Sequence, residues 1–275
     1  MELKATTYEV ADRVATITLN RPHRLNAWTG RMQTEYRSCL AAAADDETVR
    51  VIVVTGAGMG FCAGADVEAL GGHVDRGGYD DGVAPDVARP GYGADPRFDA
   101  DFAYHFGIPK PIIAAVNGMA VGGGLEWALS ADMILAAEHA RFALPEIKAG
   151  TLADAATLKL PRRIPYHIAM DLLLTGRWME VAEAHQRGLV NEILPAGQLL
   201  PRARELAALL AGGPPLVFAA IKEVVRESQT LSFEEALRGT RERRFRTVEI
   251  LYGSEDQKEG ARAFAEKREP IWKGR

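Results

Sequence analysis

Residues 122–146 read GGGLEWALSADMILAAEHARFALPE and combine three glycines, an apolar run and two separated glutamates. The glycines follow an apolar, β-branched segment, PIIAAVNG (111–118), and precede LEWALSA (125–131), whose spacing is helical. A strand, a glycine turn and a helix in this order are typical of α/β proteins. The stretch therefore predicts an α/β core, with Glu126 in the first turn of a helix and Glu146 just beyond a later strand.

The same pattern extends outward along the N-terminal two-thirds of the chain. RVATITLN (13–20), VRVIVVTG (49–56) and DMILAAE (132–138) read as further strands. From about Pro161 helical periodicities take over, and Gly-Gly-Pro-Pro at 212–215 marks a helix end followed by a helix start. We expect an α/β core over residues 1–200 and a helical region over residues 201–275.

Composition excludes several classes of protein. The chain has 275 residues, 47% of them hydrophobic, and a formal net charge of −4 without a block of basic residues, which argues against a nucleic-acid partner. The N-terminus lacks the layout of a signal peptide, no apolar run is long enough for a membrane span, and two cysteines suggest thiols in a reducing compartment. We expect a cytoplasmic protein, and the scattered histidines predict no metal site.

Signatures of other enzyme classes are missing or incomplete. TGAGMGF (55–61) fails the glycine spacing of a dinucleotide-binding turn, and neither a nucleophile elbow nor a Walker A sequence occurs.

Residues 71–99 are rich in Gly, Asp and Pro, and predict a long loop that is either a tolerated insertion or a lid over a pocket.

Two glycine turns could stabilise negative charge. N–H groups at a helix N-terminus have no intrahelical partner, so Gly122 to Gly124 and the turn in FCAGADVEAL (61–70) could direct two donors at one carbonyl oxygen. The alternative is that these glycines only allow close packing of helices and strands.

The two glutamates are candidates for acid and base. Each lies in an apolar context, and a buried carboxyl whose pKa rises toward neutrality suits proton transfer. The alternatives are a surface glutamate at a helix N-terminus for Glu126 and a loop glutamate for Glu146.

Five segments in order along the chain resemble the enoyl-CoA hydratase/isomerase (crotonase) superfamily, and LPRRIP (160–165) with the tail is most similar to its carnitinyl-CoA dehydratase (crotonobetainyl-CoA hydratase) branch. The segments are NRPHRLNAW (20–28), FCAGADVEAL (61–70), residues 111–150, LLLTGRWMEVAEAHQRGLVNEILP (172–195) and GARAFAEKREPIWKGR (260–275). The resemblance implies a spiral of ββα repeats with a C-terminal helical region that forms trimers, usually as a dimer of trimers.

The resemblance also implies a site for an acyl-CoA thioester. The N–H groups of Ala65 and Gly123 would form an oxyanion hole, and Glu126 and Glu146 fall on the positions of the catalytic glutamates. The segments implied to bind coenzyme A contain Leu25, Ala63, Asp66 and Val67, with Arg24 and Lys267 as phosphate partners. No metal or redox cofactor is implied, because coenzyme A enters as part of the substrate.

One segment departs from the family pattern. After PEIKAG (145–150) family hydratases carry a proline and a Gly-Gly pair, whereas this chain reads TLADAA (151–156). Asp154 becomes a candidate third acid in the pocket; the alternative is an N-cap of the next helix.

Enoyl-CoA hydration to a 3-hydroxyacyl-CoA is the activity that the resemblance implies, with Glu126 and Glu146 on the positions of the two catalytic glutamates. The same chemistry on crotonobetainyl-CoA is the first alternative, and an aromatic enclosure would favour its trimethylammonium group. The available aromatic residues are Trp28, Tyr79, Tyr92, Tyr104, Trp127 and Trp178. A Δ3,Δ2-enoyl-CoA isomerase and an inactive acyl-CoA-binding protein are further alternatives.

Overall fold

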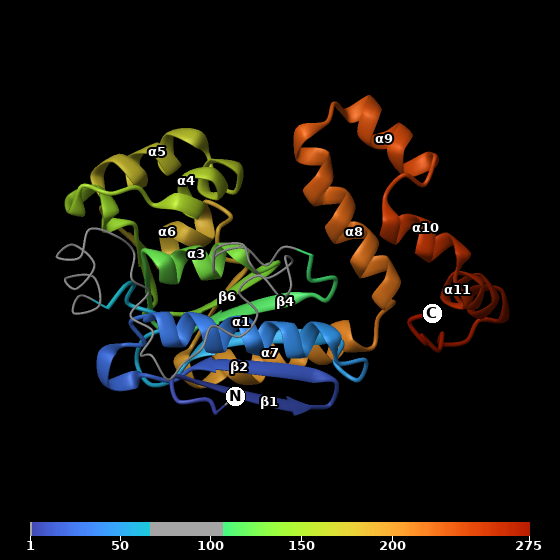
Figure 1. The fold of residues 1–275 in the computed structure, drawn as a ribbon, viewed down its shortest axis with the longest axis horizontal. Coiled ribbons are helices and arrows are strands. Elements are labelled where there is room, and N and C mark those ends of the chain that lie inside the picture. Colours follow the sequence, from blue (N-terminus) through green and yellow to red (C-terminus); the bar gives the residue numbers. More distant parts are fainter. Residues whose placement is uncertain (1, 67–106) are drawn as a thin grey trace.

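A twisted six-stranded sheet forms the centre of the computed structural model, which describes residues 2–66 and 107–275 (Figure 1). The predicted loop at 71–99 lies outside the described residues. The spatial order of the sheet is β1 (Thr6–Ala11), β2 (Val14–Leu19), β3 (Val51–Gly56), β4 (Ile112–Val116), β6 (Met133–Ala137) and β9 (Glu192–Leu194). β1 and β2 form an antiparallel hairpin, and every other pairing is parallel.

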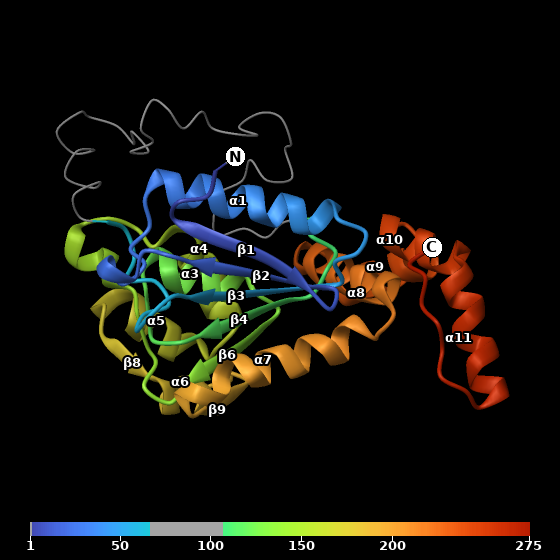
Figure 2. The ribbon, with the colours of Figure 1, turned by 90° about the horizontal axis from the view of Figure 1, so that it is seen from below.

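Helices cover both faces of this sheet, which explains why β4 and β6 are apolar at every position and β3 begins with four consecutive apolar residues. Ile52 and Val54 of β3 pack on one side, in a core that includes α1 (Gly30–Asp45), while Val51 and Val53 pack on the other side. Figure 2 shows α1 over one face and α7 (Ala196–Ala211) under the opposite face. Successive side chains of a strand point to opposite faces, so one apolar run supplies both layers.

A second, three-stranded sheet consists of β5 (Met119–Val121), β7 (Arg141–Ala143) and β8 (Trp178–Glu180). β4 is followed by β5 and α3 (Gly123–Ser130), and β6 is followed by β7 and then, after one 3-10 turn, by α4 (Asp154–Lys159). This succession is the predicted ββα repeat. Because β5 and β7 pair in parallel, the chain after β7 returns next to the start of α3.

The remaining helices complete the core and a C-terminal arm. They are α5 (Tyr166–Thr175), α6 (Val181–Gln186), α8 (Pro215–Glu227), α9 (Phe233–Arg241), α10 (Arg246–Gly253) and α11 (Glu255–Glu266). The short 3-10 turns are η1 (Pro22–Arg24), η2 (Pro145–Ala149), η3 (Leu160–Arg162) and η4 (Ser228–Thr230).

Helices α8 to α11 form an arm that projects from the core in both views (Figures 1 and 2). The arm has its own small apolar cluster of Ala220, Phe245 and Val248. By contrast, α7 packs on the large sheet through small residues such as Ala203 and Ala207. Helix α7 spans the predicted boundary between residues 200 and 201, and it packs on the core sheet. The helices that pack in the arm begin after Gly212 to Pro214.

In the described part of the chain no single helix is long and apolar enough to cross a membrane. The stretch formed by α7 and residues 215–230 meets the same criteria of length and composition, but it bends by 103° at the break.

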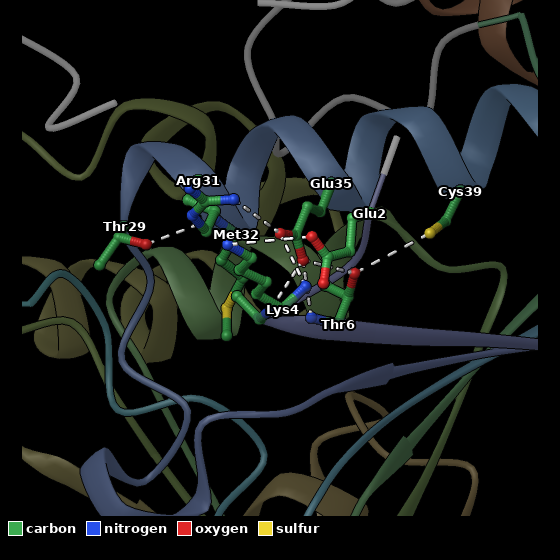
Figure 3. Close-up of polar contacts among 9 residues, drawn as sticks. Glu2, Lys4, Thr6, Thr29, Arg31, Met32, Glu35 and Cys39 are labelled. Atoms are coloured by element: carbon green, nitrogen blue, oxygen red, sulfur yellow. Dashed lines mark hydrogen bonds and ion pairs between the residues drawn. The ribbon is translucent and has the colours of Figure 1, made fainter. Parts of the chain in front are cut away.

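A fully buried carboxylate joins the first helix to the first strand. Glu35 of α1 has 0% exposure and accepts backbone N–H groups of Lys4, Ala5 and Thr6 at 3.0, 2.8 and 2.9 Å (Figure 3). The Thr6 hydroxyl and the Arg31 guanidinium also lie beside it, at 3.1 and 3.7 Å. Both oxygens of Glu35 are therefore occupied by donors, which identifies a structural carboxylate.

Replacement of Glu35 by Ala should lower the free energy of unfolding by about 3 kcal/mol, because buried N–H groups that lose their acceptor cost roughly 1–3 kcal/mol each. Chemical denaturation monitored by circular dichroism measures the change. Glu47→Ala, at an exposed position beyond α1, is the matched control. Equal stability of the two variants would contradict this assignment.

Candidate active site

The site is built around the N-terminus of α3. Gly122 is the N-cap, with φ 52° and ψ −126°, a backbone conformation that side chains oppose. Its N–H donates to the carbonyl of Ala143 at 2.9 Å, and its carbonyl accepts the N–H of Glu126 at 3.0 Å. The glycine thus turns the chain from β5 directly into the helix.

The second glycine turn lies against the first. A Cβ on Gly124 would meet the carbonyl oxygen of Cys62 at 2.4 Å, and Val121 N–H donates to the same carbonyl at 2.9 Å. Within residues 2–66 and 107–275, the N–H groups of Ala65 and Gly123 have no hydrogen-bond acceptor. The structure therefore brings the two predicted donor segments to one edge of the fold.

Glu126 is buried, with 5% exposure, in the first turn of α3. Its Oε1 accepts the N–H of Ala156 in α4 at 2.9 Å. The interpretation of Glu126 as a surface residue is wrong, because α4 packs over the start of α3 and covers this side chain. A hydrogen bond from a backbone N–H favours the ionised carboxylate.

Glu146 faces Gly122 from the 3-10 turn η2. An added Cβ on Gly122 would lie 2.5 Å from Glu146 Oε1, so the carboxyl lies directly beside the N-terminus of α3. Its Oε2 is buried and has no hydrogen-bond partner in the described part of the chain. Burial raises the pKa of Glu146, the negative charge of Asp154 raises it further, and a hydrogen bond from its own backbone lowers it.

Asp154 is the first residue of α4 and is exposed. The interpretation of Asp154 as an N-cap is wrong: Ala153 occupies that position and makes no side-chain cap bond. The negative charge of Asp154 raises the pKa of Glu146, so Asp154 acts electrostatically on this glutamate.

The residues expected to hold coenzyme A come together only in part. Ala63 N–H donates to the Leu25 carbonyl at 3.0 Å, which joins two of the predicted segments. Asp66 N–H donates to the Trp28 carbonyl at 3.0 Å, and the Asp66 carboxylate pairs with Arg21 at 3.0 Å. The Asp66 carboxylate therefore holds its turn to Arg21 within the chain.

The other predicted contacts are dispersed. Arg24 is exposed at the end of η1, beside Leu25. Lys267 is the C-cap of α11 in the arm, which lies far from α3 in both views (Figures 1 and 2). Val67 lies outside the described residues. Within one chain, Lys267 lies apart from the other residues that were predicted to bind coenzyme A.

The described tryptophans have structural neighbours. Trp127 is buried and packs on Tyr36 with ring centroids 4.9 Å apart. The face of Trp178 is covered by the Arg141 guanidinium at 4.1 Å, and Trp28 is partly buried against the core. Tyr79, Tyr92 and Tyr104 lie outside the described residues.

The family of this chain follows from its similarity to known proteins. A family model described as enoyl-CoA hydratase/isomerase matches residues 9–275. The chain belongs to the enoyl-CoA hydratase/isomerase family. The predicted fold class and family are confirmed.

Two curated relatives and two solved structures illustrate the similarity. The carnitinyl-CoA dehydratase of Salmonella arizonae is 42% identical over 260 residues, 94% of each chain, and that of Proteus mirabilis is 40% identical over 264 residues, 95% of each chain. The enoyl-CoA hydratase of Mycobacterium tuberculosis has a TM-score of 0.83 at 35% identity, covering 98% of this chain and 99% of that one. The enoyl-CoA hydratase of Bacillus anthracis has a TM-score of 0.82 at 30% identity, covering 99% and 100%. The predicted similarity to the carnitinyl-CoA dehydratase branch is confirmed.

Two residues of this family member, Asn26 and Ala156, support the site without having been predicted from sequence. Asn26 is fully buried, and its amide donates to the carbonyls of Ala57 and Gly60 at 2.9 and 2.8 Å, which holds the glycine turn. Ala156 contributes only its backbone N–H. An Asn after a proline-containing turn is a recognisable local signal, whereas a backbone contact across 30 positions has none in the sequence.

Gly122→Ala should destabilise the fold by about 1–3 kcal/mol through backbone strain, and should also displace Glu146 and reduce turnover. The reason is the Cβ position, 2.5 Å from Glu146 Oε1. Thermal unfolding and steady-state kinetics test both effects. Gly197→Ala is the control, since a Cβ there meets nothing within 4 Å; equal behaviour of the two variants would refute the geometry.

Proposed function

We propose that this protein is an enoyl-CoA hydratase that adds water reversibly, in syn geometry, across the double bond of a 2-enoyl-CoA thioester and forms a 3-hydroxyacyl-CoA. The observation that carries the proposal is the pair of glutamates at the N-terminus of α3. Glu126 accepts an N–H group, whereas Glu146 Oε2 is buried without a hydrogen-bond partner among the described residues.

These unequal surroundings support different roles in proton transfer for the two glutamates. A backbone N–H stabilises negative charge on Glu126, so this residue acts as the base that takes a proton from water. Desolvation raises the pKa of Glu146 and favours its protonated form, so this residue donates a proton to Cα. The oxygen of water adds to Cβ, and the next turnover requires the proton to pass from Glu126 back to Glu146.

The thioester carbonyl would accept hydrogen bonds from the N–H groups of Ala65 and Gly123. As water adds to Cβ, negative charge develops on this oxygen as an enolate. Donors fixed at the end of a helix need no reorganisation, and each contributes about 3 kcal/mol to stabilising the transition state. Gly123 directly follows Gly122, where an added Cβ would lie 2.5 Å from Glu146 Oε1.

Crotonobetainyl-CoA is the second candidate substrate. The carnitinyl-CoA dehydratases of Salmonella arizonae and Proteus mirabilis, at 42% and 40% identity, support it. An isomerase needs one acid only, and an inactive binding protein needs none, so the two glutamates favour hydration over both alternatives.

Coenzyme A recognition, assembly and location belong to the same proposal. Leu25, Ala63 and the carbonyl side of Asp66 would line the coenzyme A groove, with Val67 and Arg24 beside them. Lys267 in the arm would reach the site of another copy, in a homotrimer or a dimer of trimers.

No metal or redox cofactor is needed for this chemistry, and two buried free thiols suit a cytoplasmic location.

Glu126→Gln and Glu146→Gln should each lower the hydration rate by roughly a hundredfold or more, because each removes a proton-transfer group without changing shape. Loss of the enoyl thioester absorbance with crotonyl-CoA and crotonobetainyl-CoA, side by side, measures activity and substrate preference. Glu138→Gln, at an exposed position after β6, is the control. Near-wild-type turnover in both active-site variants would rule out the two-acid mechanism.

Asp154→Asn should move the alkaline limb of the rate profile to lower pH. Glu146 must be protonated to act as the acid, so activity falls as pH rises through its pKa. The Asp154 charge raises that pKa, and its removal lowers it. Initial hydration rates across pH measure the limb; an unchanged or upward-shifted limb would contradict the assignment of Glu146 as the acid.

A further inference from the structure

Two hydrogen bonds tie α4 to α3, and a third, within α3, links one of them to Glu126. Ala156 N–H donates to the Glu126 carboxylate at 2.9 Å. At the other end of the same residue, the Ser130 hydroxyl donates to the Glu126 carbonyl at 2.8 Å, and Lys159 Nζ donates to that hydroxyl oxygen at 2.6 Å. One helix therefore holds Glu126 at its side chain and, through Ser130, at its backbone.

The spacing of these bonds controls rotation as well as distance. Ser130 follows Glu126 by four positions, and Lys159 follows Ala156 by three, so each pair spans about one helical turn. Two contacts one turn apart prevent α4 from rolling on α3. This matters because α4 has only six residues and is too short to be stable without tertiary contacts.

We propose that Lys159 and Ser130 are positioning residues for Glu126. Their hydrogen bond sets the rotation of α4, which directs the Ala156 N–H at the Glu126 carboxylate and fixes the orientation of that carboxylate toward the reacting water. The proposal rests on the proposed hydratase function. A rotation of α4 about its axis would turn the Glu126 carboxylate away from the water molecule that it deprotonates.

Variants can separate this role from simple packing. Lys159→Met keeps an unbranched apolar stem of similar length and removes the donor, and Ser130→Ala removes the hydroxyl that links Lys159 to Glu126. Each should lower kcat about tenfold, in line with the cost of a misplaced catalytic group, while KM and the Kd of butyryl-CoA stay within about twofold. Lys159→Arg, which keeps a cationic donor, should recover most of the lost rate.

The double variant tests whether the two residues act together. If they act through one hydrogen bond, Lys159→Met with Ser130→Ala should be no slower than the slower single variant, since contacting residues are not additive. Lys258→Met, at an exposed lysine in the arm, is the matched control and should have wild-type kinetics. If Lys159→Met fails to fold, Ser130→Ala and Lys159→Arg still carry the test.

Hydrogen–deuterium exchange followed by mass spectrometry gives a readout independent of turnover. The peptide covering 153–160 should exchange faster in Lys159→Met and Ser130→Ala than in the wild type and in Lys258→Met. Wild-type kcat in both single variants, or additive losses in the double variant, would overturn the positioning role alone. A wild-type chain that hydrates neither crotonyl-CoA nor crotonobetainyl-CoA would overturn the proposed function, and the catalytic role of this pair with it.

Discussion

The positive φ of Gly122 is the constraint on which the candidate site depends. With no Cβ at this position, the chain leaves β5 and enters α3 without an intervening loop, and Glu146 Oε1 occupies the space that a side chain would need. The same turn exposes the first N–H groups of α3 beside that carboxyl. The backbone conformation of Gly122 thus determines both the position of the free N–H groups that can stabilise negative charge and the position of the Glu146 carboxyl beside them.

Three glutamates of this chain show how the surroundings of a carboxyl decide its use. Glu35 is saturated with backbone donors and ties α1 to β1. Glu126 accepts an N–H from α4, whereas burial and the negative charge of Asp154 raise the pKa of Glu146. Burial alone therefore does not identify a catalytic acid; the pattern of donors around each oxygen separates the structural residue from the candidate pair.

The arm illustrates a separation between folding and assembly. Its helices share a small apolar cluster, and Lys222 anchors α8 to the core by donating to Asp132 at 2.6 Å and to the Lys110 carbonyl at 2.8 Å. Several large apolar side chains of the arm remain exposed, among them Phe233 at 83% and Phe264 at 88%. Exposed apolar area of this kind suits contact with other chains, in accord with the proposed trimer.

The sequence alone determined the α/β class, the strands from their β-branched runs, the helix after Gly122 and, through five ordered motifs, the family. These are local or linear signals, since strand and helix periods and turn residues are set by neighbouring positions. Tertiary structure decided what lies close in space but far apart in sequence: the burial of Glu126 under α4, the contact of Glu146 with Gly122, and the Lys159–Ser130 bond. In the folded chain α7 packs on the core sheet, and Ala153 rather than Asp154 is the N-cap of α4. Such contacts depend on packing between helices, and no residue pattern along one chain specifies the distance between two atoms that packing brings together.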